Sequence, residues 1–282
     1  MLIMYQEKYI LYKSNTLYQL QRITNKEVLL VFFHGLGDSS LSYRKFFFRD
    51  ELKNYDIFIS DLIGHGKSSS TEDYSFINQC NALSFQLNMI INQYNKVIFI
   101  PHSMGGIHAT ILAKSYYNCI SGIFAIESSI TEYGSFIAKE VNKVTNSSKN
   151  FVKWFNTFLA NIYLQILSDK KNILQDYYAS LHYVRLKAFQ ENAIEMYDLA
   201  NSINTKEFKN IIGYDFSNLN IPKAYCLGKN GNQIKSIPFL KVNKIAINFF
   251  PTNSHWVAQA CPKEFCKKLV EFINETKKIN SE

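Results

Sequence analysis

The sequence has few cysteines, and their arrangement does not suggest a disulfide framework. The five cysteines include no C-x-x-C pair, and an odd number cannot all pair with one another. No run of 18 or more apolar residues occurs, and the N-terminus lacks a basic stretch followed by a long apolar core. These absences argue against a disulfide-stabilised secreted domain, a membrane span and a signal peptide. A reducing, cytoplasmic location is therefore the simplest expectation.

Long blocks of one charge are also missing. The net charge is +8, but the lysines are scattered, and no block is longer than pairs such as Lys267-Lys268 and Lys277-Lys278. The positive balance therefore carries little weight as a sign of a phospholipid surface, and we expect no nucleic-acid partner. Hydrophobic residues make up 47% of the 282 residues and charged residues 19%, which is typical of a globular protein with a substantial core.

Short apolar segments alternate with amphipathic ones along most of the chain, which predicts an α/β fold with a mostly parallel sheet flanked by helices. The first two strands should form an antiparallel hairpin at one edge. The expected strands are 9–12, 17–23, 28–33, 56–60, 97–100, 122–126, 224–227 and 245–249. The segment after Ser39 should begin with a helix capped by Asp38 or Ser39.

Residues 130–215 interrupt this alternation. They contain no clear strand, and Phe151, Trp154, Phe155 and Phe158 lie at helical spacing. The pattern predicts a helical cap at 130–215, inserted between a first core segment at 1–129 and a second at 216–282. The aromatic residues can contact an apolar substrate or form the cap's own core, and the sequence favours neither.

A candidate nucleophile follows the expected strand 97–100. Ser103 lies in His102-Ser103-Met104-Gly105-Gly106, directly before an amphipathic helix. A hydroxyl nucleophile needs a tight turn that exposes it, and a helix N-terminus favours negative charge beside it. The alternative is that Ser103 only caps the helix.

The chain resembles the α/β-hydrolase superfamily through His34-Gly35, the loop from Asp61 to Ser68, the Ser103 turn and the late His255. The resemblance implies an α/β-hydrolase fold, with the N–H groups of Leu36 and Met104 as the oxyanion hole. Among six histidines, His255 lies in the final loop, where a general base would reach Ser103. Two residues depart from the usual pattern, because Pro101 and Ser254 stand where the family often has glycine.

The acid of the triad is the least regular assignment. Many relatives carry an aspartate in the loop that here runs from Gly228 to Asn232 and has no carboxylate. Some members place the acid one strand earlier, and Glu127 stands at the end of that strand, 24 residues after Ser103. We therefore expect Glu127 to orient His255. The alternative is that Glu127 contacts only the cap, while Asp61 should fix its own loop.

These residues predict a serine hydrolase that cleaves a carboxylic ester through an acyl-enzyme on Ser103. We expect a small-molecule partner with an apolar acyl group, and neither a cofactor nor a metal. A serine at the turn argues, by resemblance, against dehalogenase or epoxide hydrolase chemistry. Cleavage of a thioester or a carbon–carbon bond is an alternative, as is a ligand receptor that has kept the fold without turnover.

Overall fold

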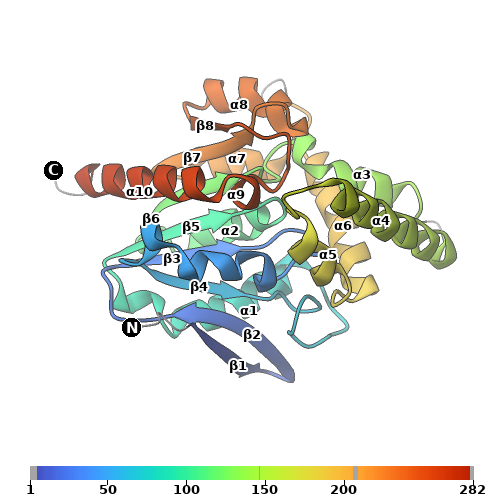
Figure 1. Cartoon of the computed structure of the whole chain (residues 1–282), viewed down its shortest axis with the longest axis horizontal. Helices are drawn as coiled ribbons and strands as arrows, with labels where there is room; N and C mark the ends of the chain where they lie inside the picture. The colour runs from blue at the N-terminus through green and yellow to red at the C-terminus, as the bar shows by residue number, and fades with distance from the viewer. Residues whose placement is uncertain (1–4, 146, 206–208, 280–282) are drawn as a thin grey trace.

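A computed structural model describes residues 5–145, 147–205 and 209–279. Its centre is a single sheet with strand order β1-β2-β4-β3-β5-β6-β7-β8 among the described residues (Figure 1). The strands are β1 (Gln6–Tyr12), β2 (Asn15–Arg22), β3 (Val28–Phe33), β4 (Asp56–Ser60), β5 (Lys96–Pro101), β6 (Ile120–Ile126), β7 (Lys223–Gly228) and β8 (Ala246–Phe250). β1 and β2 are antiparallel to each other, β2 is antiparallel to β4, and the other neighbours are parallel.

The predicted fold class is confirmed. β3 and β4 occupy the predicted residues, and the other strands begin or end one to three residues from the expected positions. All six residues of β3 are buried because helices cover both faces of the sheet. Leu29 and Val31 point to one face, and Leu30 and Phe32 to the other.

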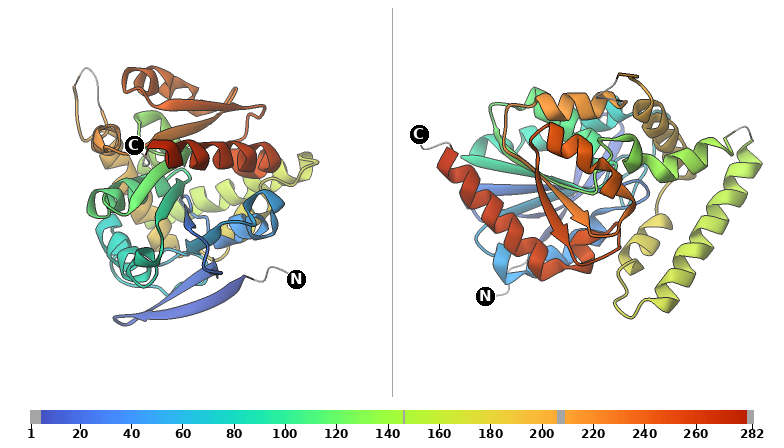
Figure 2. Two further views of the ribbon diagram at one scale, coloured as in Figure 1. Left: turned by 90° about the vertical axis from the view of Figure 1, so that its left-hand side faces the viewer. Right: turned by 90° about the horizontal axis from the view of Figure 1, so that it is seen from above.

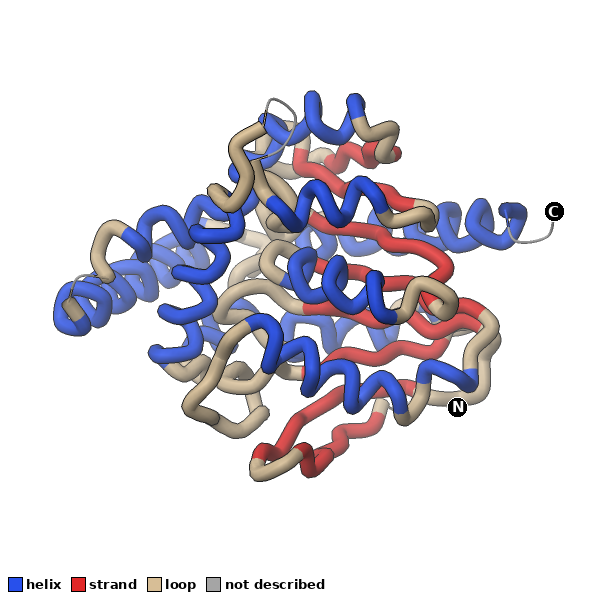
Figure 3. Tube along the Cα trace, turned by 180° about the vertical axis from the view of Figure 1, so that it is seen from behind, coloured by secondary structure: helices blue, strands red, loops and turns tan. Residues whose placement is uncertain are grey.

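Helices lie on both sides of the sheet, as Figure 3 shows from behind. α1, α2 and α7 pack on the face that contains Val31, whereas η1 and α10 pack on the face that contains Phe32. The α-helices are α1 (Phe76–Asn88), α2 (Gly105–Ser115), α3 (Phe136–Asn142), α4 (Ser148–Ser168), α5 (Gln175–Leu181), α6 (Leu186–Ala200), α7 (Ile211–Asn218), α8 (Ile237–Val242), α9 (Val257–Ala260) and α10 (Pro262–Ile279). The 3-10 helices are η1 (Ser40–Phe48), η2 (Asp50–Leu52), η3 (Ile91–Gln93), η4 (Glu132–Ser135) and η5 (Asn232–Ser236).

The helix expected after Asp38 is the 3-10 helix η1. Its N-cap is Ser39, whose hydroxyl accepts a hydrogen bond from the N–H of Leu41 at 3.3 Å. Tyr43, Phe46 and Phe47 are buried from this segment. Their spacing fits an α-helix and a 3-10 helix equally, which is why the sequence pattern did not distinguish the two.

A helical insertion lies between β6 and β7, and within the described residues it contains η4 and α3 to α7 but no strand. The insertion extends beyond one end of the sheet, as Figure 1 and the right-hand view of Figure 2 show. Phe151 and Phe155 of α4 are buried against Phe189 of α6. The aromatic stripe thus packs as the insertion's own core, while the proposed boundaries at 130 and 215 stay predictions.

No helix within the described ranges combines the length and the apolar character needed to cross a lipid bilayer.

Candidate active site

Ser103 lies in a tight turn between β5 and α2. Its φ is +52°, a left-handed conformation that is costly for a residue with a Cβ and that occurs at functional turns. The N–H of Ser103 donates to the carbonyl of Ile126 at 3.1 Å, which ties the turn to the end of β6. Gly105 must be small, because a Cβ there would lie 2.5 Å from the carbonyl oxygen of Phe33.

Glu127 follows the adjacent strand β6 and is also in a left-handed conformation, with a φ of +42°. Its side chain is buried, and Oε1 accepts a hydrogen bond from the N–H of Gly228 at 2.8 Å. The side-chain amide of Gln233 donates to the Glu127 carbonyl, and the hydroxyl of Tyr225 donates to Oε1 of Gln233 at 2.7 Å. The end of β7 therefore holds the carboxylate of Glu127, and the segment after β7 holds its main-chain carbonyl.

His255 lies in the loop after β8, and its Nδ1 is 3.6 Å from Oε2 of Glu127. This distance allows an ion pair but is longer than a hydrogen bond. Contacts of this kind often tighten when a substrate binds. The ring also contacts Phe136 of α3 edge-on, with the ring centres 5.6 Å apart. His255 thus lies between the sheet edge and the insertion.

His102 makes the contact that joins the Ser103 turn to the His255 loop. Its Nε2 lies 3.1 Å from the carbonyl oxygen of His255, so this nitrogen carries the proton and donates. Burial, together with the neighbouring His255, lowers the pKa of His102 well below its usual range. A ring whose pKa is lowered in this way is a weak base, which disfavours His102 as the proton acceptor for Ser103. The sequence has no signal for this contact.

The turn after β3 passes directly beside the nucleophile. A Cβ on Gly35 would lie 3.1 Å from the Cβ of Ser103, and Leu36 lines the same cavity as Ser103 and His255. In the part of the chain described, the N–H groups of Leu36 and Met104 donate to no protein acceptor. The turn is anchored by His34, whose Nε2 accepts from the N–H of Leu62 at 3.0 Å. Burial lowers the pKa of His34 to about 4, so this ring is neutral at pH 7.

A cavity of about 20 Å³ separates these residues from the insertion. Phe136, Tyr177 and Met196 form its wall on the helical side. This volume holds about one water molecule. Helices α3, α5 and α6 therefore cover Ser103 closely.

Asp38, which the sequence pattern offered only as a possible helix cap, is a buried carboxyl group on the wall of this cavity. Its Oδ1 accepts from the N–H of Ser39 at 2.8 Å and from the hydroxyl of Ser42 at 2.5 Å. Its Oδ2 has no hydrogen-bond partner within the described residues, and burial raises the pKa of Asp38 to about 7. The carboxyl group is thus partly protonated near neutral pH.

Asp61 lies outside the cavity. Its carboxylate accepts from the N–H groups of Ser40 at 2.6 Å and Lys67 at 2.8 Å, as expected for a residue that fixes its own loop.

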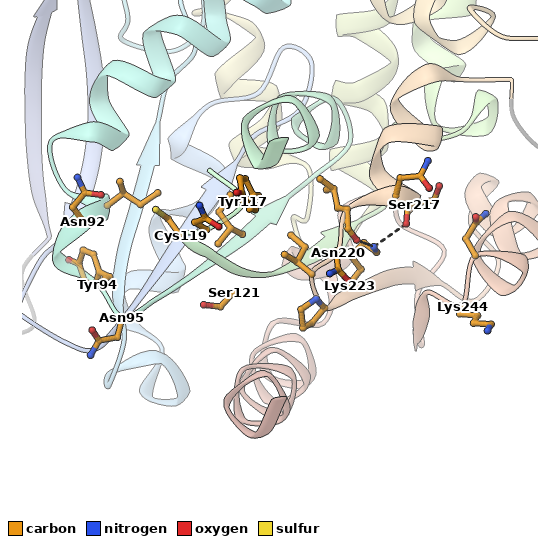
Figure 4. A pocket seen from close by; sticks show the side chains of 18 residues that line it. Asn92, Tyr94, Asn95, Tyr117, Cys119, Ser121, Ser217, Asn220, Lys223 and Lys244 are labelled. Atoms are coloured by element: carbon orange, nitrogen blue, oxygen red, sulfur yellow. Dashed lines mark hydrogen bonds between the residues drawn. The ribbon is translucent and has the colours of Figure 1, made fainter. Parts of the chain in front are cut away.

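A much larger hollow of about 1040 Å³ lies at the opposite edge of the sheet (Figure 4). Its walls include the starts of β6 and β7, whereas Ser103 and Glu127 follow strand ends. The amine of Lys223 in this hollow donates to the carbonyls of Ser217 and Leu219. Its positive charge therefore stabilises the loop before β7. Ligands of parallel α/β sheets bind at the carboxyl ends of the strands, which favours the smaller cavity as the functional one.

Within residues 5–145, 147–205 and 209–279, no three or more His, Cys, Asp and Glu side chains are grouped so that they could hold a metal ion.

Comparisons with known proteins agree with this architecture. The family model described as the alpha/beta hydrolase fold matches residues 28–213, and the chain belongs to this family. A Haemophilus influenzae protein whose name gives it as an esterase/lipase is 24% identical over 279 residues, covering 94% of this chain and 91% of its own. Protein phosphatase methylesterase 1 of Candida albicans is 27% identical over 144 residues, covering 46% of this chain and 39% of that relative's length.

A solved structure from work on carboxylesterases of Nitrososphaera gargenis has the same fold, with a TM-score of 0.74 and 15% identity. The match covers 96% of this chain and 99% of that chain.

Proposed function

We propose that the protein is a serine hydrolase that cleaves a carboxylic ester of a small molecule through an acyl-enzyme on Ser103. The observation that carries this proposal is the arrangement of three residues at one sheet edge. Ser103 in its left-handed turn lines the same cavity as His255, and His255 lies 3.6 Å from the buried carboxylate of Glu127. The esterase names of the two relatives in the comparisons support the same reaction type.

In this mechanism Oγ of Ser103 attacks the ester carbonyl carbon, and His255 accepts the hydroxyl proton. The N–H groups of Leu36 and Met104 stabilise the negative charge that develops on the carbonyl oxygen. Collapse of this intermediate breaks the ester bond, and His255 returns the proton to the departing alcohol. Water, with its proton taken by His255, then attacks the acyl carbon. The bond to Oγ of Ser103 breaks, His255 returns the proton to Oγ, and the carboxylic acid leaves. Glu127 orients His255 and stabilises its protonated form.

The size of the cavity places a condition on this reaction. A space of about 20 Å³ cannot admit an ester, so the helices that carry Phe136, Tyr177 and Met196 must shift when the substrate enters. The cavity wall on this side is apolar apart from the Tyr177 hydroxyl, which donates to the Leu36 carbonyl at 3.2 Å. This composition supports an apolar acyl group as the part of the substrate nearest the nucleophile.

The test is labelling with a fluorophosphonate probe, together with turnover of a short p-nitrophenyl ester. Wild-type protein should be labelled, and Ser103→Ala should abolish both labelling and turnover. Ser129→Ala is the matched control, because the Ser129 hydroxyl donates to the Gly134 carbonyl and is not available as a nucleophile. A folded wild-type protein that shows neither labelling nor turnover would favour a ligand receptor with this fold.

A further inference from the structure

The outer face of α4 differs from its inner face in a way that packing does not explain. Phe151, Phe155 and Ile162 are buried against the rest of the insertion. On the opposite side of the helix, Tyr163, Leu164 and Leu167 are 47%, 60% and 66% exposed. These three residues and the exposed Ala160 recur at helical spacing, so they form one apolar surface, called here the α4 patch.

Lysines lie at both ends of the α4 patch. Lys149 and Lys153 are exposed on the same face about three and about two turns before it, and the exposed Lys170 and Lys171 follow the helix. None of these four lysines forms an ion pair with a side chain of the described residues. No Asp or Glu occurs from residue 141 to 168. Asp169 directly follows the helix, and its carboxylate accepts hydrogen bonds from the N–H groups of Lys171 and Ile173 at 2.9 Å. The helix itself therefore carries positive charge only.

We propose that the α4 patch docks on an anionic lipid surface. A helix that presents Leu and Tyr side chains between lysines inserts its apolar side chains at the headgroup boundary, while its lysines contact anionic headgroups. Figure 1 and the right-hand view of Figure 2 place α4 along the outer edge of the molecule, away from both termini, where a flat surface can reach it. This docking is peripheral and does not require a membrane span.

A second copy of the chain fits the patch less well. Because lysines lie at both ends of the patch, parallel and antiparallel pairs of α4 would each bring lysines together. The helix has no carboxylate to offset this repulsion, and the carboxylate of Asp169 just after it is bonded to the N–H groups of its own turn. An anionic bilayer supplies both the apolar phase and the negative charge.

The patch lies on the part of the fold that covers Ser103. Tyr163 of α4 contacts Tyr178 of α5 with the ring centres 5.7 Å apart, and the neighbouring Tyr177 lines the cavity. Docking through α4 would thus place the covering helices beside the lipid. The docking itself does not depend on the proposed ester hydrolysis.

The experiment is co-sedimentation of the full chain with vesicles of phosphatidylcholine alone and of phosphatidylcholine mixed with phosphatidylglycerol. Wild-type protein should bind the mixed vesicles and bind the neutral ones weakly. The double variant Leu164→Gln/Leu167→Gln should lose about tenfold or more in partitioning, because its side chains no longer gain from leaving water. Lys149→Gln/Lys153→Gln should lose roughly fivefold for each lysine, with a weaker salt dependence.

The matched control is Leu11→Gln/Val242→Gln, which changes two side chains that are 70% and 72% exposed elsewhere on the surface. This control should bind as wild type does, and so should Ser103→Ala, which separates docking from catalysis. All surface variants should keep wild-type turnover of a short soluble ester. Failure of the wild type to bind mixed vesicles, or an equal loss in the control, would overturn the proposal. Light scattering that shows a dimer abolished by Leu164→Gln/Leu167→Gln would instead assign the patch to a second copy.

Discussion

The ends of β6 and β7 lie side by side in the sheet, yet they carry different chemistry. β6 is followed directly by Glu127, which is 1% exposed and in a strained left-handed conformation. β7 ends in Gly228, followed by the exposed Lys229 and Asn230 and then by Gly231, with no carboxylate. Both ends can face the loop that contains His255, because parallel strands bring their carboxyl ends to one edge.

The segment after β7 supports the carboxylate of its neighbour. Gly228 supplies an N–H to Oε1 of Glu127, and Gln233 donates to the Glu127 carbonyl. The oriented N–H of Gly228 stabilises the buried carboxylate, whereas the Gln233 amide fixes the main chain of Glu127. The comparison teaches that the acid that orients the histidine can follow either of two neighbouring strands, because both strands end at the same sheet edge. The loop that lacks the acid holds it in place.

The strongest test of this comparison is Glu127→Gln. The amide keeps the shape of the side chain but removes the negative charge that would stabilise protonated His255. We expect kcat for a short ester to fall on the order of 10⁴-fold. A thermal melt has to show that the variant is folded, because an unfolded protein would imitate a catalytic loss. Turnover near the wild-type value in a folded variant would remove Glu127 from the triad.

A smaller effect should come from Gly231→Ala. A Cβ at this position would lie 3.2 Å from Oε1 of Glu127, so the carboxylate must move by a few tenths of an ångström. The φ of Gly231 is −74°, which alanine adopts without strain. Since a displacement of 1 Å can cost about a hundredfold, we expect kcat to fall roughly threefold to tenfold.

The control for Gly231→Ala is the double variant with Glu127→Gln. If the alanine acts through the carboxylate, the double variant should be no slower than Glu127→Gln alone. An additive loss would mean that Gly231→Ala disturbs the loop by another route.

The sequence predicted the sheet well because the physical signal is local. A parallel strand covered on both faces reads as a continuous apolar run, so β3 and β4 were placed at their observed residues. The position of Glu127 at the same sheet edge as Ser103 followed from topology, since one helix and one strand return the chain to that edge. These inferences need only the order of elements and the residue at each strand end.

The contacts that hold the candidate site could not be predicted in the same way. The bond from Gln233 to Glu127 joins residues 106 positions apart, and the bond from His102 to His255 joins residues 153 positions apart. Each bond depends on side-chain rotamers and on the path of a loop, and the hydrophobic periodicity of the sequence predicts neither. The burial of Oδ2 of Asp38 could not be predicted either, because an aspartate near the start of a helix is first interpreted as a helix cap.

The smallest expected effect belongs to Asn230→Ala, and it tests whether the end of β7 has an orienting role of its own. Asn230 is exposed, and its amide donates to Oδ1 of Asn253 at 3.1 Å. An amide can orient a histidine, but it lacks the charge that stabilises the protonated ring. Asn253 precedes His255 by two residues, so loss of this bond can loosen the loop only indirectly. Because Asn230 is exposed and its side-chain hydrogen bond is to Asn253 rather than to His255 or Glu127, kcat should stay within about twofold of wild type. The free energy of unfolding should change by at most about 0.5 kcal/mol. The measurement is kcat and KM on the same short ester, in parallel with Glu127→Gln. A loss in Asn230→Ala as severe as that in Glu127→Gln would assign the orienting role to the loop after β7. It would contradict the inference that Glu127, after β6, orients His255 while the end of β7 only supports Glu127.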